Sequence, residues 1–237
     1  MSIYKKLITA KKNGRKLLAV LLDPEKITLT ALPDMMNILS DKVDVFLVGG
    51  STVAENQTKE LVLALKKLTA IPIVLFPGDY TQVTDTADAL LFLSLLSGRN
   101  PEYLIEQHVK SIPAIHKKKL EIIPTGYILI DGGATTAVQR VSKTKPLPQT
   151  AIDTIVHTAL AGKYSGKKLI YLEAGSGAKK PVSTKIIKSV KEELDLFLCI
   201  GGGIRTKAQL KNAYNAGADM VVIGTALENN PLLLNEW

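Results

Sequence analysis

The chain has 237 residues, of which 46% are hydrophobic, and its 30 Lys and Arg outnumber 22 Asp and Glu to leave a formal net charge of +8. This length suits one large core, and the basic balance suits a nucleic acid, an anionic membrane surface or an anionic small molecule. Aromatic residues make up only 5% of the chain, and no basic run is interleaved with Phe or Tyr. Because a platform for single-stranded nucleic acid needs such stacking residues, we expect no nucleic-acid partner.

The apolar runs and the single cysteine indicate in which cellular compartment the protein works. The run Leu17 to Leu22 follows N-terminal lysines but is too short for a signal peptide and stops at Asp23. The best local run, Ala89 to Leu96, is less than half of the roughly 18 to 20 apolar residues that span a bilayer. Cys199 lies in an apolar run, so we expect it to be buried and without a disulfide partner in the chain. We expect a cytoplasmic protein with at most peripheral membrane contact.

Eight short apolar runs recur along the chain. Most are followed by a polar or glycine-bearing turn and then by a segment with helical spacing, such as residues 183–194 and 206–216. Alternation of strand and helix predicts a parallel sheet, and eight units predict closure into a (β/α)8 TIM barrel. We therefore expect a single α/β domain over residues 1–237, with strands over 16–22, 43–48, 71–76, 89–95, 121–130, 168–173, 196–200 and 220–224.

Two connections depart from a regular barrel. Residues 77–85 are too few and too poor in apolar spacing for a full helix, so we expect a loop in place of the third helix. Residues 131–148 carry a glycine pair, Arg140 and two prolines before a helix resumes near Gln149. This segment is a candidate mobile lid or partner surface.

The ends of the first two strands carry oxygen-bearing side chains. Asp23 ends the first strand, on the face where barrel active sites lie, and could hold a metal ion or a proton. Ser51 follows the second strand and could supply a second oxygen ligand beside it. The alternative for both is a helix N-cap, because Asp before Pro24 and Ser after glycine are common helix starts.

Magnesium suits these two side chains better than zinc does. A magnesium ion takes one or two protein oxygens, several waters and the oxygens of a substrate phosphate, which one Asp and one Ser would satisfy. The three histidines, His108, His116 and His157, fall on expected helices or their ends, away from the strand ends. We therefore expect magnesium and no zinc site.

The sixth strand ends in the string Tyr171 to Ala178, in which a carboxylate precedes a turn of small residues. Glu173 could accept a hydroxyl proton or orient that hydroxyl, and Gly175 to Gly177 would let the backbone approach a ligand closely. The alternative is a tight turn with an exposed Glu.

Two glycine-rich strand ends, at residues 201–203 and 224–226, lie a little over twenty residues apart with a helical segment between them. The loops after the last two strands of a (β/α)8 barrel commonly close on a phosphate, because glycine exposes backbone N–H groups there. The sequence therefore predicts a substrate that carries a phosphate.

With these residues in view, nearly the whole chain resembles the geranylgeranylglyceryl phosphate synthase family, which includes bacterial PcrB-like members. The glycine strings are shared by many phosphate-binding barrels, whereas Asp-Pro-Glu-Lys at 23–26 and Tyr-Leu-Glu-Ala-Gly-Ser-Gly at 171–177 are much more specific. Further matching strings, in family order, are residues 48–51, 75–78, 126–130, 201–205 and 224–226.

The resemblance implies the reaction and the roles of the residues. Family members join the sn-3 hydroxyl of sn-glycerol 1-phosphate to a polyprenyl diphosphate with magnesium, in the synthesis of archaeal-type ether lipids; geranylgeranyl diphosphate is the expected donor. Asp23 and Glu173 would be catalytic, and Asp23 and Ser51 would bind magnesium. Glycerol 1-phosphate would be held by Tyr171, Leu172, Glu173, Ala174, Gly175, Ser176, Gly177, Gly202, Gly203, Gly224 and Thr225.

Residues 126–148 resemble the longer, archaeal-like branch of the family, which implies a homo-oligomer, with a hexamer expected over a dimer. Whether Glu173 removes the hydroxyl proton or only positions the hydroxyl stays open at this point. The alternative function is that of another phosphate-binding TIM barrel, an isomerase or lyase of amino-acid biosynthesis. Against it, the third strand ends in Pro77-Gly78 without a lysine, and Asp131 comes late after the fifth strand. A non-catalytic protein that binds anions through its basic surface is the third possibility.

Overall fold

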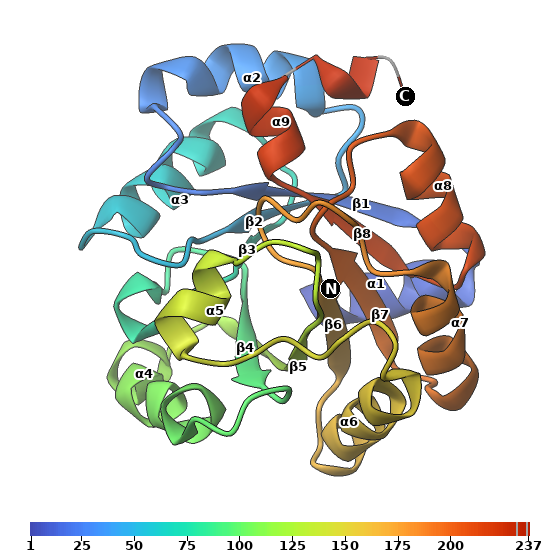
Figure 1. Cartoon of the computed structure of the whole chain (residues 1–237). Helices are drawn as coiled ribbons and strands as arrows, with labels where there is room; N and C mark the ends of the chain where they lie inside the picture. Colours follow the sequence, from blue (N-terminus) through green and yellow to red (C-terminus); the bar gives the residue numbers. More distant parts are fainter. Residues whose placement is uncertain (231, 236) are drawn as a thin grey trace.

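The computed structural model describes residues 1–230, 232–235 and 237. These residues form a closed parallel barrel in which each strand pairs with its neighbours in sequence and the last strand pairs with the first (Figure 1). The predicted TIM barrel and its strands are confirmed. The strands are β1 (Leu17–Leu22), β2 (Val45–Val48), β3 (Ile73–Leu75), β4 (Ala89–Leu95), β5 (Glu121–Leu129), β6 (Leu169–Glu173), β7 (Phe197–Gly201) and β8 (Met220–Ile223).

Helices surround the barrel, and their starts have local causes. The Ser183 hydroxyl accepts a hydrogen bond from the Ile186 N–H, and Thr206 and Gln209 form a capping box, so two helices begin where the sequence indicated. The helices are α1 (Ile3–Lys12), α2 (Leu32–Leu39), α3 (Gln57–Leu68), α4 (Gln107–Ile115), α5 (Ala137–Ser142), α6 (Ile152–Tyr164), α7 (Thr184–Glu193), α8 (Lys207–Asn215) and α9 (Thr225–Asn229).

Alternation along each strand divides the apolar side chains between two cores. Tyr171 points into the barrel and joins an inner cluster with Leu47 and Leu129, whereas Leu172 points outward and packs with residues such as Val190 under the helices. Cys199 is buried in the inner cluster as a free thiol. The barrel interior is therefore a packed core below the site.

Helix α1 lies across the N-terminal end of the barrel, behind the strands in Figure 1. Its side chains Ile3, Leu7 and Ala10 join the inner core. The Tyr4 N–H donates to Glu121 Oε1 at 3.0 Å, at the start of β5, and Lys11 Nζ donates to the carbonyl that precedes β7 at 2.9 Å. This end of the barrel is closed.

Two connections at the other end are irregular. Residues 76–88, between β3 and β4, contain a 3-10 helix, Tyr80–Gln82, within a loop. The segment after β5 carries α5 and is tied down by two backbone bonds of Leu147, whose N–H donates to the Leu129 carbonyl and whose carbonyl accepts from the Asp131 N–H, both at 2.9 Å. Its role as a lid or partner surface stays a prediction.

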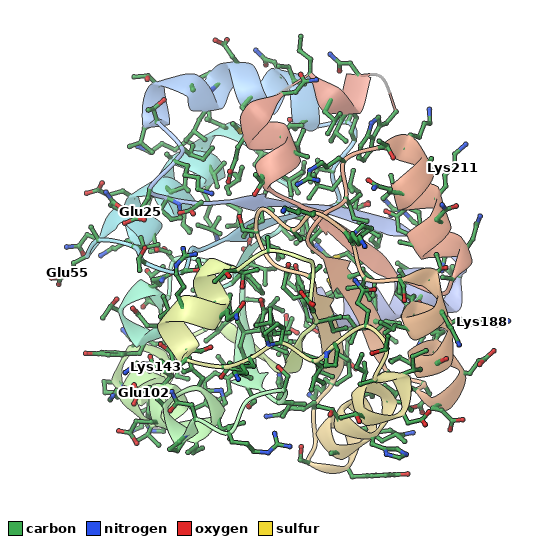
Figure 2. The ribbon with its side chains drawn as sticks, in the orientation of Figure 1. Glu25, Glu55, Glu102, Lys143, Lys188 and Lys211 are labelled. Carbon is green, nitrogen blue, oxygen red and sulfur yellow. The ribbon has the colours of Figure 1, made fainter. Side chains whose placement is uncertain are left out.

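The surplus positive charge lies on more than one side of the molecule. Lys188 and Lys211 project outward from α7 and α8, while Lys143 lies at the end of α5 on the other side of the view (Figure 2). Within the described ranges, no helix is both long enough and apolar enough to cross a membrane. The absence of a nucleic-acid partner stays a prediction.

Candidate active site

A cavity with about 200 Å³ of free space opens at the carboxyl ends of the strands. It brings together residues from the ends of five strands: Asp23 from β1, Ser51 from β2, Glu173 from β6, Gly202 from β7 and Thr225 from β8. The predicted residues that line it are Asp23, Ser51, Tyr171, Glu173, Gly175, Ser176, Gly177, Gly202, Gly203, Gly224 and Thr225.

Leu172 and Ala174 do not line this cavity. Both side chains are fully buried in the outer core, because alternate residues of β6 point away from the barrel interior. The Ala174 N–H is also engaged, since it donates to the Gly201 carbonyl at 3.0 Å. Of the predicted string, these two residues shape the strand and do not present side chains to a ligand.

Asp23 does not act as a helix N-cap. Its Oδ1 accepts a hydrogen bond from the Glu25 N–H at 3.1 Å, within a turn, while the next helical element begins several residues later and has Thr28 as its N-cap. Ser51 is not an N-cap either, because α3 begins after Asn56. The capping alternative therefore explains neither residue, and both side chains face the cavity.

These two residues have a donor set that fits magnesium. A Cβ at Gly50, next to Ser51, would lie 2.5 Å from Asp23 Oδ1, so the carboxylate packs directly against that turn. Throughout the described ranges, no three or more His, Cys, Asp and Glu side chains gather as a metal-binding group. A site with one carboxylate and one hydroxyl leaves room for waters and phosphate oxygens, as magnesium requires and zinc does not.

Glu173 is only 6% exposed, so the alternative of an exposed Glu in a tight turn is wrong. Its Oε1 accepts a hydrogen bond from the Gly175 N–H at 2.6 Å. Burial raises the pKa of Glu173 to about 7, and the bond from Gly175 and the adjacent Tyr171 hydroxyl offset this only in part. A carboxyl group with this pKa can both accept and release a proton near neutral pH.

An aromatic cluster supports Glu173 from below. The Tyr171 ring lies 5.1 Å from the Phe76 ring and 5.5 Å from the Tyr127 ring, measured between centroids. The buried Tyr171 hydroxyl has no hydrogen-bond partner in the part of the chain that the structure describes. The hydroxyl lies beside the Glu173 carboxyl and helps to lower its pKa, and a polar ligand atom there would give it a better hydrogen bond, since leaving a buried hydroxyl unpaired costs about 1 to 3 kcal/mol.

Backbone N–H groups, together with Asp23, Ser51 and Glu173, line one half of the cavity, which we call the polar half. Those of Ser176, Gly177, Gly202, Gly203, Gly224 and Thr225 donate to no other group within the described ranges. Gly202 has φ +81°, and a Cβ there would lie 2.4 Å from Glu173 Oε1, so only glycine fits. The Ser176 and Thr225 hydroxyls lie 2.9 Å apart and join two of the loops. Free N–H groups converging on one cavity are suited to a phosphate.

Lys26 and Arg205 are the cationic side chains among the described residues that line the cavity, and the sequence analysis gave them no role. Lys26 Nζ lies 2.9 Å from Glu228 Oε2 on α9 and 3.6 Å from Asp23 Oδ2. Arg205 Nη2 donates to the Ala178 carbonyl at 2.7 Å. Both belong to strings already singled out, Asp-Pro-Glu-Lys and Gly-Gly-Gly-Ile-Arg, which was the available signal.

The remaining half of the cavity is largely apolar, and its residues were not predicted from the sequence. Alternate leucines of β4 form its floor, and the π-helix before α4 (Glu102–Glu106), α4 and α5 form its walls. His108, expected away from the strand ends, lines this half; its ring stacks on Phe92 with centroids 3.9 Å apart. Burial lowers the pKa of His108, so the ring is neutral at pH 7. The apolar residues that line this half include Leu90, Leu91, Phe92, Leu93, Leu95, Tyr103, Val138 and Val141.

The closed parallel barrel, the convergent N–H groups and the buried carboxyl define an enzyme of the (β/α)8-barrel class that acts on a phosphate-bearing substrate. A sequence model of the PcrB family matches residues 11–236. The chain therefore belongs to the PcrB, or geranylgeranylglyceryl phosphate synthase, family.

Individual relatives agree over nearly full length. The geranylgeranylglyceryl phosphate synthase of Zunongwangia profunda is 55% identical over 94% of this chain and 95% of the relative. That of Methanopyrus kandleri is 39% identical over 91% of this chain and 90% of the relative. The crystal structure of (S)-3-O-geranylgeranylglyceryl phosphate synthase from Thermoplasma acidophilum, in complex with sn-glycerol-1-phosphate, has a TM-score of 0.93 at 32% identity and covers 99% of this chain and 95% of that one.

Proposed function

We propose that the chain is a magnesium-dependent phosphoglycerol geranylgeranyltransferase. It joins the sn-3 hydroxyl of sn-glycerol 1-phosphate to carbon 1 of a polyprenyl diphosphate, with geranylgeranyl diphosphate as the expected donor, and releases diphosphate. The product is an ether precursor of archaeal-type phospholipids. The observation that carries this proposal is a single cavity that combines free N–H groups, a buried carboxyl and an apolar groove.

Glycerol 1-phosphate would occupy the polar half. Its phosphate would accept hydrogen bonds from the free N–H groups of Gly202, Gly203, Gly224 and Thr225. Its hydroxyls would then reach Glu173, with the unpartnered Tyr171 hydroxyl alongside. The related structure bound to sn-glycerol-1-phosphate supports this substrate.

Asp23 and Ser51 would hold magnesium. When bound, the ion neutralises the charge that develops on the leaving diphosphate, which makes the diphosphate a better leaving group. Lys26, beside Asp23, and Arg205 add positive charge to the same cavity.

Glu173 would act on the attacking hydroxyl. As the hydroxyl oxygen bonds to carbon 1 of the prenyl chain, the carbon–oxygen bond to diphosphate breaks and the hydroxyl proton passes to the Glu173 carboxylate. A pKa of about 7 suits this transfer, because the carboxylate form is well populated at neutral pH and is basic enough to take the proton.

The prenyl chain would lie in the apolar half, over β4 and against α5. Burying a hydrocarbon chain there contributes binding energy in proportion to its area, at about 25 cal/mol per Å². This groove would keep carbon 1 next to the polar half, where both reacting groups meet.

We also propose that the chain assembles into a cytoplasmic homo-oligomer, with a hexamer expected, and has at most peripheral membrane contact. Ile105, Val109 and Ile112 support self-association, because they are exposed at helical spacing along one face of the π-helix and α4. Light scattering after size-exclusion chromatography tests this: a monomer at micromolar concentration would contradict it.

The decisive experiment measures product from glycerol 1-phosphate and radiolabelled farnesyl, geranylgeranyl and heptaprenyl diphosphates, with and without magnesium. A prenyl ether that requires magnesium and is best formed from the geranylgeranyl donor is the expected result. No ether from any donor, together with turnover of a phosphoribosyl substrate, would favour the isomerase or lyase alternative instead.

A further inference from the structure

Gln82 is a buried polar residue that the proposed reaction does not use. It ends the 3-10 helix Tyr80–Gln82 in the loop between β3 and β4, and only 3% of it is exposed. Burying a side-chain amide is costly unless its donor and its acceptor both find partners. The partners of this amide therefore indicate what it does.

The side-chain amide of Gln82 makes both of its hydrogen bonds with one residue, Gly50. The Gly50 N–H donates to Gln82 Oε1 at 3.1 Å, and Gln82 Nε2 donates to the Gly50 carbonyl at 2.8 Å. The backbone pairing of β2 with β3 ends at Val48 and Leu75, after which the Phe76 N–H makes a last bond to Val48. The Gln82 side chain thus pairs with Gly50 as a neighbouring strand would.

Gly50 lies between the two proposed metal ligands. Ser51 follows it directly, and the Asp23 carboxylate packs against its Cα, where a Cβ would lie 2.5 Å from Oδ1. Gly78, from the same loop as Gln82, fits against this turn, since a Cβ there would lie 2.3 Å from the Gly50 carbonyl oxygen. The position of Gly50 therefore sets how far Ser51 stands from Asp23.

We propose that Gln82 is a positioning residue for the metal site, which fixes Gly50 so that the Ser51 hydroxyl and the Asp23 carboxylate bind one ion together. The inference rests on the proposed function, because the roles of Asp23 and Ser51 belong to it. It also gives the β3–β4 loop a function: the loop returns to the end of β2 and carries Gln82 and Gly78 to the turn that they hold.

The test compares Gln82→Met with Gln149→Met. Methionine keeps the length of the side chain and removes both hydrogen bonds. Gln149 is a matched control, because its Nε2 also clamps backbone carbonyls, of Asp131 and Pro181 at 2.9 and 3.0 Å, yet neither carbonyl belongs to the turn that carries a proposed metal ligand. Gln82→Asn is the second variant, since it keeps a buried amide that is too short to reach both groups of Gly50.

The first readout is binding of Mn²⁺, which takes the same ligands as Mg²⁺. Binding is measured from the loss of the electron paramagnetic resonance signal of the free ion. We expect Gln82→Met and Gln82→Asn to weaken Mn²⁺ binding about 10-fold, about 1.4 kcal/mol, and Gln149→Met to leave it unchanged. The second readout is the Mg²⁺ concentration at half-maximal turnover, which should rise with the Gln82 variants while the KM for glycerol 1-phosphate stays constant.

Asp23→Ala separates the two possible failures. If Asp23→Ala abolishes Mn²⁺ binding but the folded Gln82 variants bind the ion as the wild type does, the inference about Gln82 is wrong and the metal site stands. If Asp23→Ala binds Mn²⁺ normally, the proposed metal site is wrong, and the role of Gln82 falls with it.

Discussion

The two halves of the cavity are built by different means. The phosphate-binding part of the polar half consists of main chain: glycines at the ends of β6, β7 and β8 present N–H groups beside the Asp23, Ser51 and Glu173 side chains. The apolar half consists of side chains from β4, α4 and α5. The polar half therefore tolerates little change of backbone, whereas the apolar half can change its shape by substitution.

Because of this difference, the phosphate and the hydrocarbon tail of the substrates are recognised by different groups. A phosphate is recognised by N–H groups that every residue except proline carries, provided that no Cβ blocks them, so the glycines carry the specificity. A hydrocarbon tail is recognised by shape alone, since dispersion and burial are not directional. Substitutions in the two halves should accordingly alter different kinetic constants.

The largest effect is expected from Asp23→Ala in the polar half. Loss of the carboxylate should lower kcat/KM by about 100-fold or more, because charge on the leaving diphosphate is no longer offset. Glu25→Ala is the control: Glu25 lies in the same string but is exposed at the edge of the molecule (Figure 2). Steady-state rates at several magnesium concentrations measure this, and equal losses in both variants would contradict the assignment.

Glu173→Gln should follow, with a loss of roughly 100-fold, in the range of general acid–base catalysis. In the wild type, kcat/KM should rise with pH up to about 7 and then level off, because the carboxylate is the active form. The variant should lack this inflection. A loss of rate with the pH profile unchanged would show that Glu173 orients the hydroxyl without taking its proton.

The same group predicts a dependence of stability on pH. Its pKa rises from 4.5 to about 7 on folding, so the folded state holds the proton more tightly than the unfolded state. Stability should therefore fall as the pH rises from about 4.5 to about 7, by at most roughly 3 kcal/mol from this group. Glu173→Gln should reduce that fall, which urea denaturation at pH 5 and pH 8 would measure.

Gly177→Ala should have a smaller effect, confined to glycerol 1-phosphate. Gly177 and Gly166 have φ +77° and +86°, and a Cβ at either would meet nothing within 4 Å, but only Gly177 lines the cavity. Both alanine variants should lose about 1 kcal/mol of stability. Gly177→Ala alone should raise the KM for glycerol 1-phosphate, by roughly 10-fold. An equal KM in both variants would mean that the ligand does not approach Gly177.

Val141→Ser, in the apolar half, should have the smallest effect. Val141 is 39% exposed and covers the groove only in part, so we expect the KM for geranylgeranyl diphosphate to rise about 2- to 5-fold, about 1 kcal/mol or less. Leu63→Ser is the control, because Leu63 is 43% exposed and does not line the cavity. A change in the KM for glycerol 1-phosphate would show that the two halves are not independent.

Two patterns in the sequence predicted the barrel and the polar half. Strands buried on both faces are continuous apolar runs, and repeated glycines at strand ends allow a close approach of the backbone to a ligand. The sequence did not show that the Leu172 and Ala174 side chains point away from the cavity, because strand alternation divides a string of consecutive residues between two cores.

The apolar groove could not be predicted in the same way. Leu93 and Val138 look like ordinary core residues in the sequence, and only the fold shows that a cavity lies beside them. Gln82 was also missed, because its partner Gly50 is far along the chain and no local pattern joins the two. Residues that act through distant backbone groups leave no sequence signal without the structure.

Helix α1 closes one end of the barrel, so ligands enter the cavity from the carboxyl ends of the strands. Ile3, Leu7 and Ala10 fill the opposite end, so glycerol phosphate, the prenyl donor, diphosphate and the finished lipid must all pass through the mouth that α5 overhangs. Because these molecules share one entrance, a molecule bound near the rim blocks the passage of one bound deeper in the cavity. Release of the apolar product through this entrance is therefore a candidate for the rate-limiting step.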